Sequence, residues 1–317
     1  MERPPLVIVT PALAAANNGN WQTAQRWARM LAGDYRVRVV DRWQQGDEAL
    51  MIALHARRSA PSVAAWRALP VARPLVVVLT GTDLYRDIAV DAAAQQSLQS
   101  ADRLVVLNER GVLALPAGLR AKARVCLQSA PPRRPLVKTG SRLRALMVGH
   151  LREEKSPQTY FQAARLLRQR QDILLDHIGA PLDALLSAEA QAMARAQPRY
   201  RWLGALPHEA TRRRIQAAHV LVHASRMEGG AHVVIEAVTS GTPVLASRID
   251  GNLGLLGAGY GGCFDWGDAA ALAALLQRCR DDAAMLPALQ VQCAARAALF
   301  EPARERRTLL ALLQGLR

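Results

Sequence analysis

The sequence predicts an α/β protein of two domains, each built on a parallel sheet. Short apolar runs recur along the chain from Leu6–Thr10 onwards, and helical segments separate most of them. The length of 317 residues allows two domains with ample cores. Ala130–Ser141 (APPRRPLVKTGS) is rich in proline and cations and has no hydrophobic periodicity, which is typical of an interdomain linker. We therefore expect one domain over residues 1–135 and a second over residues 141–300.

The N-terminal half alternates apolar runs with helical segments, as a doubly wound sheet does. The expected strands are Leu6–Thr10, Tyr35–Val40, Ala49–Leu54, Leu75–Leu79, Leu104–Leu107 and Val125–Leu127. Trp21–Leu31 is amphipathic, with Trp27 and Leu31 on its apolar side, so it predicts the first helix. The loop before it lacks the three-glycine dinucleotide fingerprint, which argues against NAD binding.

Polar groups follow three of these strands. They are the asparagine turn Asn17–Asn20, the segment His55–Ser59, and Thr80–Asp83 with Arg86 after it. Because ligands of open α/β sheets gather at the carboxyl ends of strands, we expect these loops to line one wall of a binding cleft. Any one of them alone could be an ordinary solvated loop.

The C-terminal half predicts a second sheet. Its expected strands are Leu143–Val148, Ile173–Ile178, Tyr200–Leu203, His219–Ala224 and Val244–Ala246, and its late helices are Asp268–Cys279, Ala284–Phe300 and Glu301–Arg317. Ile249–Asn252 follows the last strand and is expected to be a glycine turn.

The segment Ser225–Ser247 (SRMEGGAHVVIEAVTSGTPVLAS) carries the strongest functional pattern. Its paired glycines would let the backbone approach a ligand closely, and the helix that begins at Ala231 would point free N–H groups at an anion. Glu236 could accept two hydrogen bonds from a ribose diol, while Glu228 could reach a second polyol. The layout suits a nucleotide sugar; the alternative is a surface helix with two solvated glutamates.

EGGAHVVIEAVTSGTPVLAS resembles the E-x7-E segment of GT-B glycosyltransferases of family 4. The resemblance implies two Rossmann-like domains facing each other across a cleft, with the last helix, residues 301–317, returning to the first domain. It also implies that Glu228 and the backbone amides of Gly229, Gly230 and Ala231 meet the donor sugar and phosphate, while Glu236 holds the ribose. Where the family often has an aromatic residue or a Gly-Leu pair, this chain has Ala231 and His232.

Two further segments fit the same family. Gly149–Pro157 (GHLREEKSP) resembles its G-x-L-x-x-x-K-G segment, so Arg152 and Lys155 would grip the donor pyrophosphate, with Ser156 in place of the usual glycine. An exposed basic pair is the alternative. Gly-Thr-Asp at Gly81–Asp83 matches a His-Gly-x-Asp-like segment of the family, with Thr80 in place of the histidine.

Composition excludes several other classes of function. The formal charge of +15 is almost entirely arginine, dispersed over helical stretches, and aromatic residues make up only 4%. Nucleic-acid binders would show basic clusters with interleaved aromatics, so we expect small anionic substrates instead. No apolar run approaches the roughly 18 residues that span a membrane, and no convincing signal peptide is present. We expect a cytoplasmic protein without a membrane span.

Cysteine usage and acidic motifs argue against a metal or cofactor. The four cysteines are scattered without a CxxC pair, which favours a reduced compartment and disfavours structural zinc. No Asp-x-Asp motif stands at a strand end, so we expect a metal-independent reaction in which Arg152, Lys155 and the helix at Ala231 neutralise the leaving diphosphate.

The N-terminal segments NNGNWQTAQRWARML, ALHARRSAPSVAAW and LVVVLTGTDLYRDI are more particular. They resemble the selenosugar synthases of bacterial selenoneine biosynthesis, which couple a UDP-hexose, typically UDP-N-acetylglucosamine, to selenophosphate and form a carbon–selenium bond. Two alternatives stay open: a generic family-4 enzyme with a carbohydrate or lipid acceptor, and a non-catalytic nucleotide-sugar-binding protein.

These patterns define three sets of expected site residues. The expected catalytic residues are Glu228, His55 and Asp83. The expected nucleotide-sugar-binding residues are Gly19, Asn20, Arg152, Lys155, Glu228, Gly229, Gly230, Ala231, His232 and Glu236. The expected acceptor-binding residues are Asn18, Asn20, His55, Arg57, Arg58 and Thr82.

Overall fold

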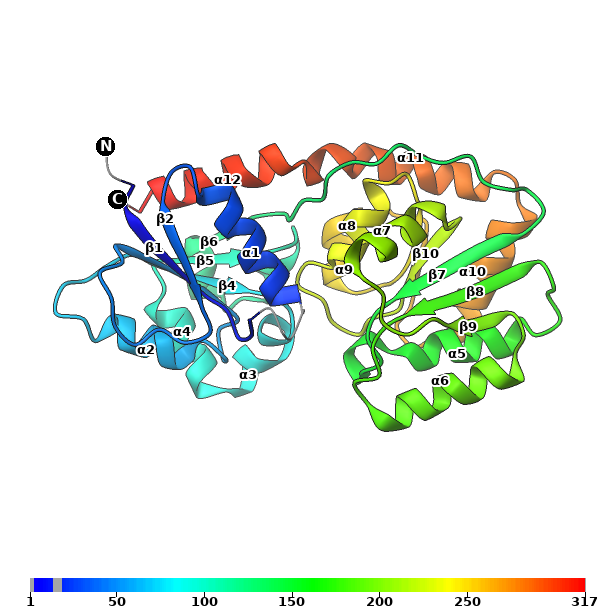
Figure 1. The fold of residues 1–317 in the computed structure, drawn as a ribbon, viewed down its shortest axis with the longest axis horizontal. Helices are drawn as coiled ribbons and strands as arrows, with labels where there is room; N and C mark the ends of the chain where they lie inside the picture. Colours follow the sequence, from blue (N-terminus) through cyan, green and yellow to red (C-terminus); the bar gives the residue numbers. More distant parts are fainter. Residues whose placement is uncertain (1–2, 14–18, 317) are drawn as a thin grey trace. The chain divides into compact units, whose positions relative to one another are not determined.

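The chain forms two compact units (Figure 1), seen in a computed structural model that describes residues 3–13 and 19–316. The N-terminal unit comprises Met1–Gln128, Glu228–Gly230 and Pro302–Arg317. The C-terminal unit comprises Ser129–Met227 and Ala231–Glu301. The division after Gln128 lies a few residues before the proline-rich segment that the sequence suggests as a linker.

The N-terminal unit contains a six-stranded parallel sheet, as expected for a doubly wound fold. Its strands are β1 (Pro5–Val9), β2 (Arg36–Val40), β3 (Leu50–Leu54), β4 (Leu75–Leu79), β5 (Arg103–Val106) and β6 (Ala123–Val125), in the order β2-β1-β3-β4-β5-β6. β3 and β4 are buried along their whole length. Burial on both faces explains why these strands read as continuous apolar runs, since helices cover a parallel sheet on both sides.

Helices cover both faces of this sheet. They are α1 (Gly19–Leu31), α2 (Ala60–Arg67), the π-helical turn η2 (Asp83–Asp87), α3 (Ile88–Val90), α4 (Ala92–Ser100), the 3-10 turns η3 (Gly111–Ala114) and η4 (Ala117–Lys122), and α12 (Pro302–Gln314). Leu6 and Ile8 point to one face and Val7 and Val9 to the other. The first face is covered by α1 and by α12, the red helix beside α1 in Figure 1, through Leu309.

The C-terminal unit contains a second six-stranded parallel sheet. Its strands are β7 (Leu143–Val148), β8 (Ile173–Ile178), β9 (Tyr200–Trp202), β10 (Val220–His223), β11 (Val244–Ser247) and β12 (Cys263–Phe264), in the order β12-β11-β10-β7-β8-β9. Counted from β7, this is the 3-2-1-4-5-6 order of nucleotide-binding doubly wound folds. The prediction of two Rossmann-like α/β domains is therefore confirmed.

The helices of the C-terminal unit include one at a place where the sequence predicts a turn. They are η5 (Glu153–Lys155), α5 (Pro157–Leu166), α6 (Ala184–Ala196), α7 (His208–Ala217), α8 (His232–Val238), α9 (Asp250–Leu256), α10 (Ala269–Asp281), α11 (Met285–Ala297) and η6 (Ala298–Phe300). The glycine turn predicted over Ile249–Asn252 is wrong, because α9 begins at Asp250. Asn252 fixes this start by donating hydrogen bonds from Nδ2 to the carbonyl and hydroxyl oxygens of Ser247, and Leu255 anchors the helix in the core.

Within residues 3–13 and 19–316, no individual helix combines the length and the apolar character of a membrane span. Taken together, Ala269–Asp281 and Met285–Phe300 pass on length and composition, although the two segments are bent by 104° at the break between them.

Candidate functional site

The predicted polar loops of the N-terminal unit follow β1, β3 and β4, at or next to the reversal of its strand order. β1 lies between β2 and β3, so the connections that leave β1 and β3 run to opposite sides of the sheet. Ligands of doubly wound folds bind outside the carboxyl ends of strands at such a reversal. Gly19 and Asn20 open α1 after β1, His55 follows β3, and Thr82 follows β4. Asn18, the remaining predicted residue of the first loop, lies outside the described residues.

His55 is buried directly after β3 in a left-handed backbone conformation with φ of 72°. Its Nε2 lies 3.1 Å from Oγ1 of Thr82, and its Nδ1 accepts a 3.4 Å hydrogen bond from the backbone N–H of Arg58. Burial lowers the pKa of His55, although the nearby Asp83 carboxylate opposes the shift. His55 and Thr82, two predicted acceptor residues, therefore belong to one hydrogen-bonded pair with a neutral imidazole.

Asp83 is completely buried beneath this pair. Its Oδ2 accepts a 2.9 Å hydrogen bond from the backbone N–H of Ala56, and its Oδ1 accepts bonds of 2.9 Å from those of Thr80 and Gly81. The carboxylate thus ties the loop after β3 to the loop after β4. Since backbone donors hold both oxygens, the geometry gives Asp83 the role of positioning His55 and Thr82.

The basic residues of this region share one acidic partner that sequence reasoning missed. Nε of Arg57 lies 2.9 Å from Oδ2 of Asp87, and Nε of Arg86 lies 3.0 Å from its Oδ1. The side chain of Asp87 is almost fully buried, whereas Arg57 and Arg58 are exposed. Asp87 stands four residues after Asp83 on the π-helical turn η2. This spacing could indicate that the two carboxylates share a face of the turn, but it does not indicate which residues Asp87 contacts.

Glu228, Gly229 and Gly230 group with the N-terminal unit. There, Nδ2 of Asn108 donates a 2.7 Å hydrogen bond to the carbonyl oxygen of Gly229. A Cβ added at Gly229 would come within 2.4 Å of the Thr80 backbone, and one added at Gly230 within 2.7 Å of the Leu107 side chain. Close packing against protein therefore requires both glycines, whereas the sequence pattern suggests a ligand as the reason for them.

The C-terminal unit has its own reversal, because β7 lies between β8 and β10. The loop after β7 carries Arg152, which is exposed, and Lys155, which is half-buried in η5. Ser156 follows with φ of 47°, in the left-handed region that favours glycine, and its Oγ accepts a 2.8 Å hydrogen bond from Nε1 of Trp266. This conformation is one that glycine adopts without strain, in keeping with the glycine that the resemblance implies at that position.

Glu236, the predicted ribose-binding residue, is a buried carboxylate with several basic neighbours. It lies on α8 with only 2% of its surface exposed. Its Oε1 is 2.6 Å from Nε2 of His208, 3.3 Å from Nδ1 of His232 and 3.7 Å from Nε of Arg212. Burial alone would raise the pKa of Glu236, but the bonds from His208 and His232 outweigh it and lower the pKa to about 2.

His208 and Arg212 lie on α7 and were not predicted from the sequence. The hydrogen bond to Glu236 raises the pKa of His208, and burial opposes this shift. His208 and Arg212 stand four residues apart and therefore share a face of the helix. This spacing is the one sequence signal that could have paired them. Their target on α8 is fixed only by the packing of the two helices.

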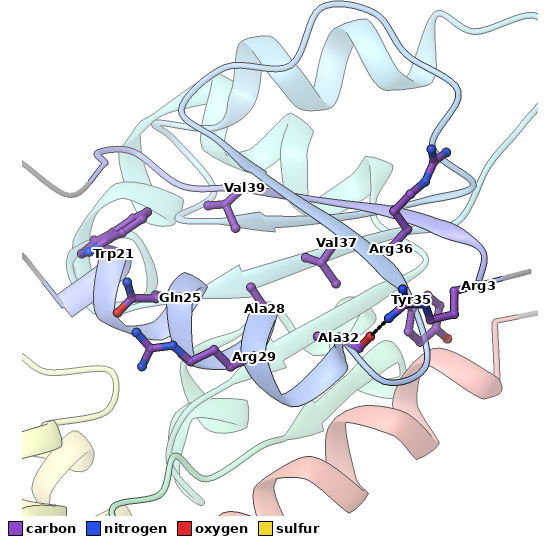
Figure 2. Close-up of a pocket in the computed structure, with 10 residues that line it drawn as sticks. All are labelled: Arg3, Trp21, Gln25, Ala28, Arg29, Ala32, Tyr35, Arg36, Val37 and Val39. Atoms are coloured by element: carbon purple, nitrogen blue, oxygen red, sulfur yellow. Dashed lines mark hydrogen bonds between the residues drawn. The ribbon is translucent and has the colours of Figure 1, made fainter.

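A separate hollow of about 390 Å³ lies between α1 and the edge strand β2 (Figure 2). Arg3, at one end of the hollow, donates a 2.5 Å hydrogen bond to the carbonyl oxygen of Ala32. The lining residues are Arg3, Trp21, Gln25, Ala28, Arg29, Ala32, Tyr35, Arg36, Val37 and Val39. None of the predicted donor or acceptor residues is among them, so this hollow is distinct from the predicted site.

Comparison with known proteins establishes the family. The family described as glycosyl transferases group 1 matches residues 132–297, more than half of the sequence. The chain therefore belongs to this family of glycosyl transferases. No curated protein matches the sequence.

Several solved structures share the fold. Sucrose-phosphate synthase from Thermosynechococcus elongatus superposes with a TM-score of 0.80 at 18% identity, covering 99% of each chain. HepE from Anabaena, in complex with UDP and glucose, gives a TM-score of 0.77 at 14% identity over 99% of this chain and 100% of HepE.

TarM from S. aureus gives a TM-score of 0.68 at 11% identity and covers 83% of this chain. The chain spans only 55% of TarM, so TarM has much additional sequence. Together with HepE and the sucrose-phosphate synthase, TarM supports the predicted GT-B fold class, whereas identities this low leave the substrates to be inferred separately.

Proposed function

We propose that this chain transfers a hexosyl group from a UDP-sugar, with UDP-N-acetylglucosamine favoured, to selenophosphate. The observation that carries the donor half is the position of Arg152 and Lys155 in the loop after β7, where the C-terminal sheet reverses its strand order. Ligands of doubly wound folds bind at such a reversal. Lysine occurs only three times in the sequence, which adds weight to its presence in that loop.

In the proposed donor complex, Arg152 and Lys155 bind the diphosphate. As the bond from the anomeric carbon to the diphosphate oxygen breaks, negative charge develops on the leaving UDP. Fixed cations that meet this charge stabilise the transition state. The proposed reaction needs no metal ion for this step, because the two side chains supply the compensating charge.

Glu236 is proposed to bind the ribose. Its low pKa keeps the carboxylate ionised at neutral pH, and an ionised carboxylate can accept two hydrogen bonds in parallel from a cis-diol. Glu228, His232 and the backbone amides of Gly229 to Ala231 are proposed donor-sugar contacts. The structures of HepE, which is solved in complex with UDP-glucose, support a UDP-sugar as the donor class.

Selenophosphate is proposed to bind the N-terminal unit through its oxyanions. Arg58 is exposed beside the His55–Thr82 pair, and arginine forks match tetrahedral oxyanions. Arg57 is partly neutralised by Asp87, so Arg58 is the stronger candidate of the two. A selenium lone pair would attack the anomeric carbon, forming the C–Se bond as the C–O bond to UDP breaks.

A carbohydrate hydroxyl is the second candidate acceptor. It is favoured by TarM, whose structure holds α-GlcNAc-glycerol and UDP. A hydroxyl acceptor requires a general base. His55 is the candidate base, and Oδ2 of Asp83, 4.0 Å from Nδ1, and Oδ2 of Asp87, 3.9 Å from Nε2, would stabilise the imidazolium that forms. Selenophosphate needs no such base, because its selenium is already nucleophilic.

Mass spectrometry of reaction products tests this proposal. The purified chain is incubated with UDP-glucose or UDP-N-acetylglucosamine and with a panel of acceptors: selenophosphate, thiophosphate, glucose and glycerol. We expect release of UDP with a selenium-containing sugar product from selenophosphate. Glycosylation of a hydroxyl acceptor alone would contradict the acceptor half, and absence of any donor turnover would favour a non-catalytic nucleotide-sugar-binding protein.

A further inference from the structure

Three side chains of the C-terminal unit form a group with the composition of a transition-metal site. His208 begins α7, and His232 and Glu236 lie one turn apart on α8. One ligand atom from each residue lies within 4.8 Å of the other two. The sequence separates His208 from the other two residues, so no short motif reveals the group.

The hydrogen bond on the far side of His232 fixes its tautomer. Its Nε2 lies 3.0 Å from the carbonyl oxygen of Ser129, which can only accept, so Nε2 carries a hydrogen. A hydrogen bond from His232 to Oε1 of Glu236, 3.3 Å away, then needs a second proton on Nδ1, because in the neutral ring Nδ1 presents a lone pair instead. Two acceptors facing each other need a cation between them, either a proton on Nδ1 or a metal ion.

The residues around this contact are also suited to a metal ion. Metal-binding histidines commonly donate their other N–H to a backbone carbonyl, as His232 does to Ser129. Two imidazoles and a carboxylate are the protein ligands of many zinc sites that keep a fourth position open. Zinc would need to separate Nε2 of His208 from Oε1 of Glu236 beyond their present 2.6 Å. His208 is more than half exposed, so its ring has room to turn.

Arg212 limits the strength of such a site. Its Nε lies 3.7 Å from Oε1 of Glu236, and its Nη2 donates a 2.9 Å hydrogen bond to the carbonyl oxygen of Pro131. The guanidinium is nearly buried and repels a divalent cation at this carboxylate. A site that shares its carboxylate with a fixed cation suits reversible binding better than a permanent structural metal.

We infer that His208, His232 and Glu236 bind a zinc-class divalent cation, and that this cation competes with the nucleotide donor. The competition rests on the proposed function, in which Glu236 accepts hydrogen bonds from the ribose. A metal ion bound to this carboxylate would occupy the oxygens that the ribose diol needs. The site is thus inhibitory and separate from the metal-independent transfer step.

Cobalt(II) binding to the full chain, without nucleotide, tests the site directly. Four-coordinate Co²⁺ absorbs strongly in the visible range and takes the ligands that zinc takes. We expect one Co²⁺ to bind per chain and Zn²⁺ to displace it. Loss of an outer-shell partner lowers metal affinity about 10- to 100-fold, and we expect loss of a direct ligand in His208→Ala to lower it by at least as much. His219→Ala, outside the cluster, is the matched control and should bind as the wild type does.

Three results would overturn the metal site: no saturable binding, equal binding by the wild type and His208→Ala, or a cobalt–thiolate absorption band. The last would assign the metal to cysteine, and none of the four cysteines belongs to the cluster. Because His208 is exposed, we expect its alanine variant to fold, and a far-UV spectrum checks this.

Calorimetric titration of UDP, with and without saturating Zn²⁺, tests the competition. We expect zinc to weaken UDP binding about tenfold or more in the wild type. Free UDP also chelates zinc, so His208→Ala is titrated in the same buffers as a control. In this variant we expect zinc to weaken UDP binding only as much as that chelation does. Equal zinc effects in both proteins would overturn the competition. Failure of UDP to bind at all would overturn the proposed donor while leaving the cobalt result unaffected.

Discussion

Trp27 donates a 2.6 Å hydrogen bond from its indole Nε1 to Oε1 of Glu305, joining α1 to α12 inside the N-terminal unit. Arg26 adds bonds from the same helix, with Nε 3.0 Å from Oε2 of Glu305. Glu305 is almost fully buried, and these two donors help to stabilise its charge. The last helix of the chain is therefore held to the first helix by a buried carboxylate as well as by apolar packing.

Glu305→Gln should lower the stability of the N-terminal unit by about 1.5–3 kcal/mol, the value of hydrogen bonds to a charged group. Urea unfolding measures the loss. Arg306→Ala is the matched control, because its 2.7 Å bond to Asp34 also links α12 to the end of α1 but is exposed. An exposed pair contributes less than about 1 kcal/mol. Equal losses in the two variants would contradict the role of Glu305.

His177 should make the C-terminal unit sensitive to acid. Burial lowers its pKa from 6.5 to about 4, while its hydrogen bond to the Gly149 carbonyl oxygen opposes the shift. The unfolded chain therefore takes up the proton first as the pH falls, so this contribution is complete above pH 6.5 and declines toward pH 4. The difference corresponds to about 3 kcal/mol.

Hydrogen exchange in β8, measured between pH 7 and pH 4 and corrected for intrinsic rates, reports this loss. His177→Gln removes the titrating group and should flatten the pH dependence. Since burial also lowers the pKa of His150 and His219, only the difference between wild type and variant is diagnostic. An identical slope in both proteins would rule out His177 as the source.

Glu236→Gln should weaken UDP binding if the proposed function is right. Losing charge-assisted hydrogen bonds of this kind costs about 1.5–3 kcal/mol, or roughly ten- to a hundred-fold in affinity. Isothermal titration calorimetry with UDP in metal-free buffer provides the measurement. Glu209→Gln is the control, because Glu209 lies on α7 next to His208 but pairs with Arg133 at the surface. An unchanged affinity in Glu236→Gln would remove this residue from the donor site.

Arg58→Ala should raise the KM for selenophosphate about tenfold, while the KM for the UDP-sugar stays near its original value. The reason is that an exposed arginine would supply the anion contact on the acceptor side only. Initial rates with each substrate varied in turn separate the two constants. Arg124→Ala, an exposed arginine of β6, should leave both unchanged. A larger rise in the KM for the UDP-sugar would show that Arg58 contacts the donor and would contradict its proposed role at the acceptor.

The sequence predicted the central strands well because these are buried on both faces. Continuous apolar runs such as Leu50–Leu54 and Leu75–Leu79 have no competing helical interpretation of that length. The two-residue strand β12 is too short to leave such a signal. The turn predicted over Ile249–Asn252 failed because the side chain of Asn252 caps β11 from within a helix, a contact that no local pattern reveals.

The candidate site could also be predicted only in part. His55 could be predicted because it follows an expected strand, whereas Arg152 was assigned from the resemblance of its segment to a family motif. The contacts of Asp83 with Ala56 and of His208 with Glu236 could not be predicted, because they depend on the packing of separate elements. Gly229 shows the limit most clearly: the requirement for glycine is real, but the atoms that impose it belong to Thr80 of the protein.

The central claim, that this glycosyl transferase forms a carbon–selenium bond, has one direct test. The purified chain is given UDP-N-acetylglucosamine labelled with ¹³C at the anomeric carbon, together with ⁷⁷Se-selenophosphate, and the product is examined by NMR. The account predicts a one-bond ⁷⁷Se–¹³C coupling at the anomeric carbon, with UDP released in equal amount. A product whose labelled carbon is bonded to oxygen, with selenophosphate unconsumed, would contradict it.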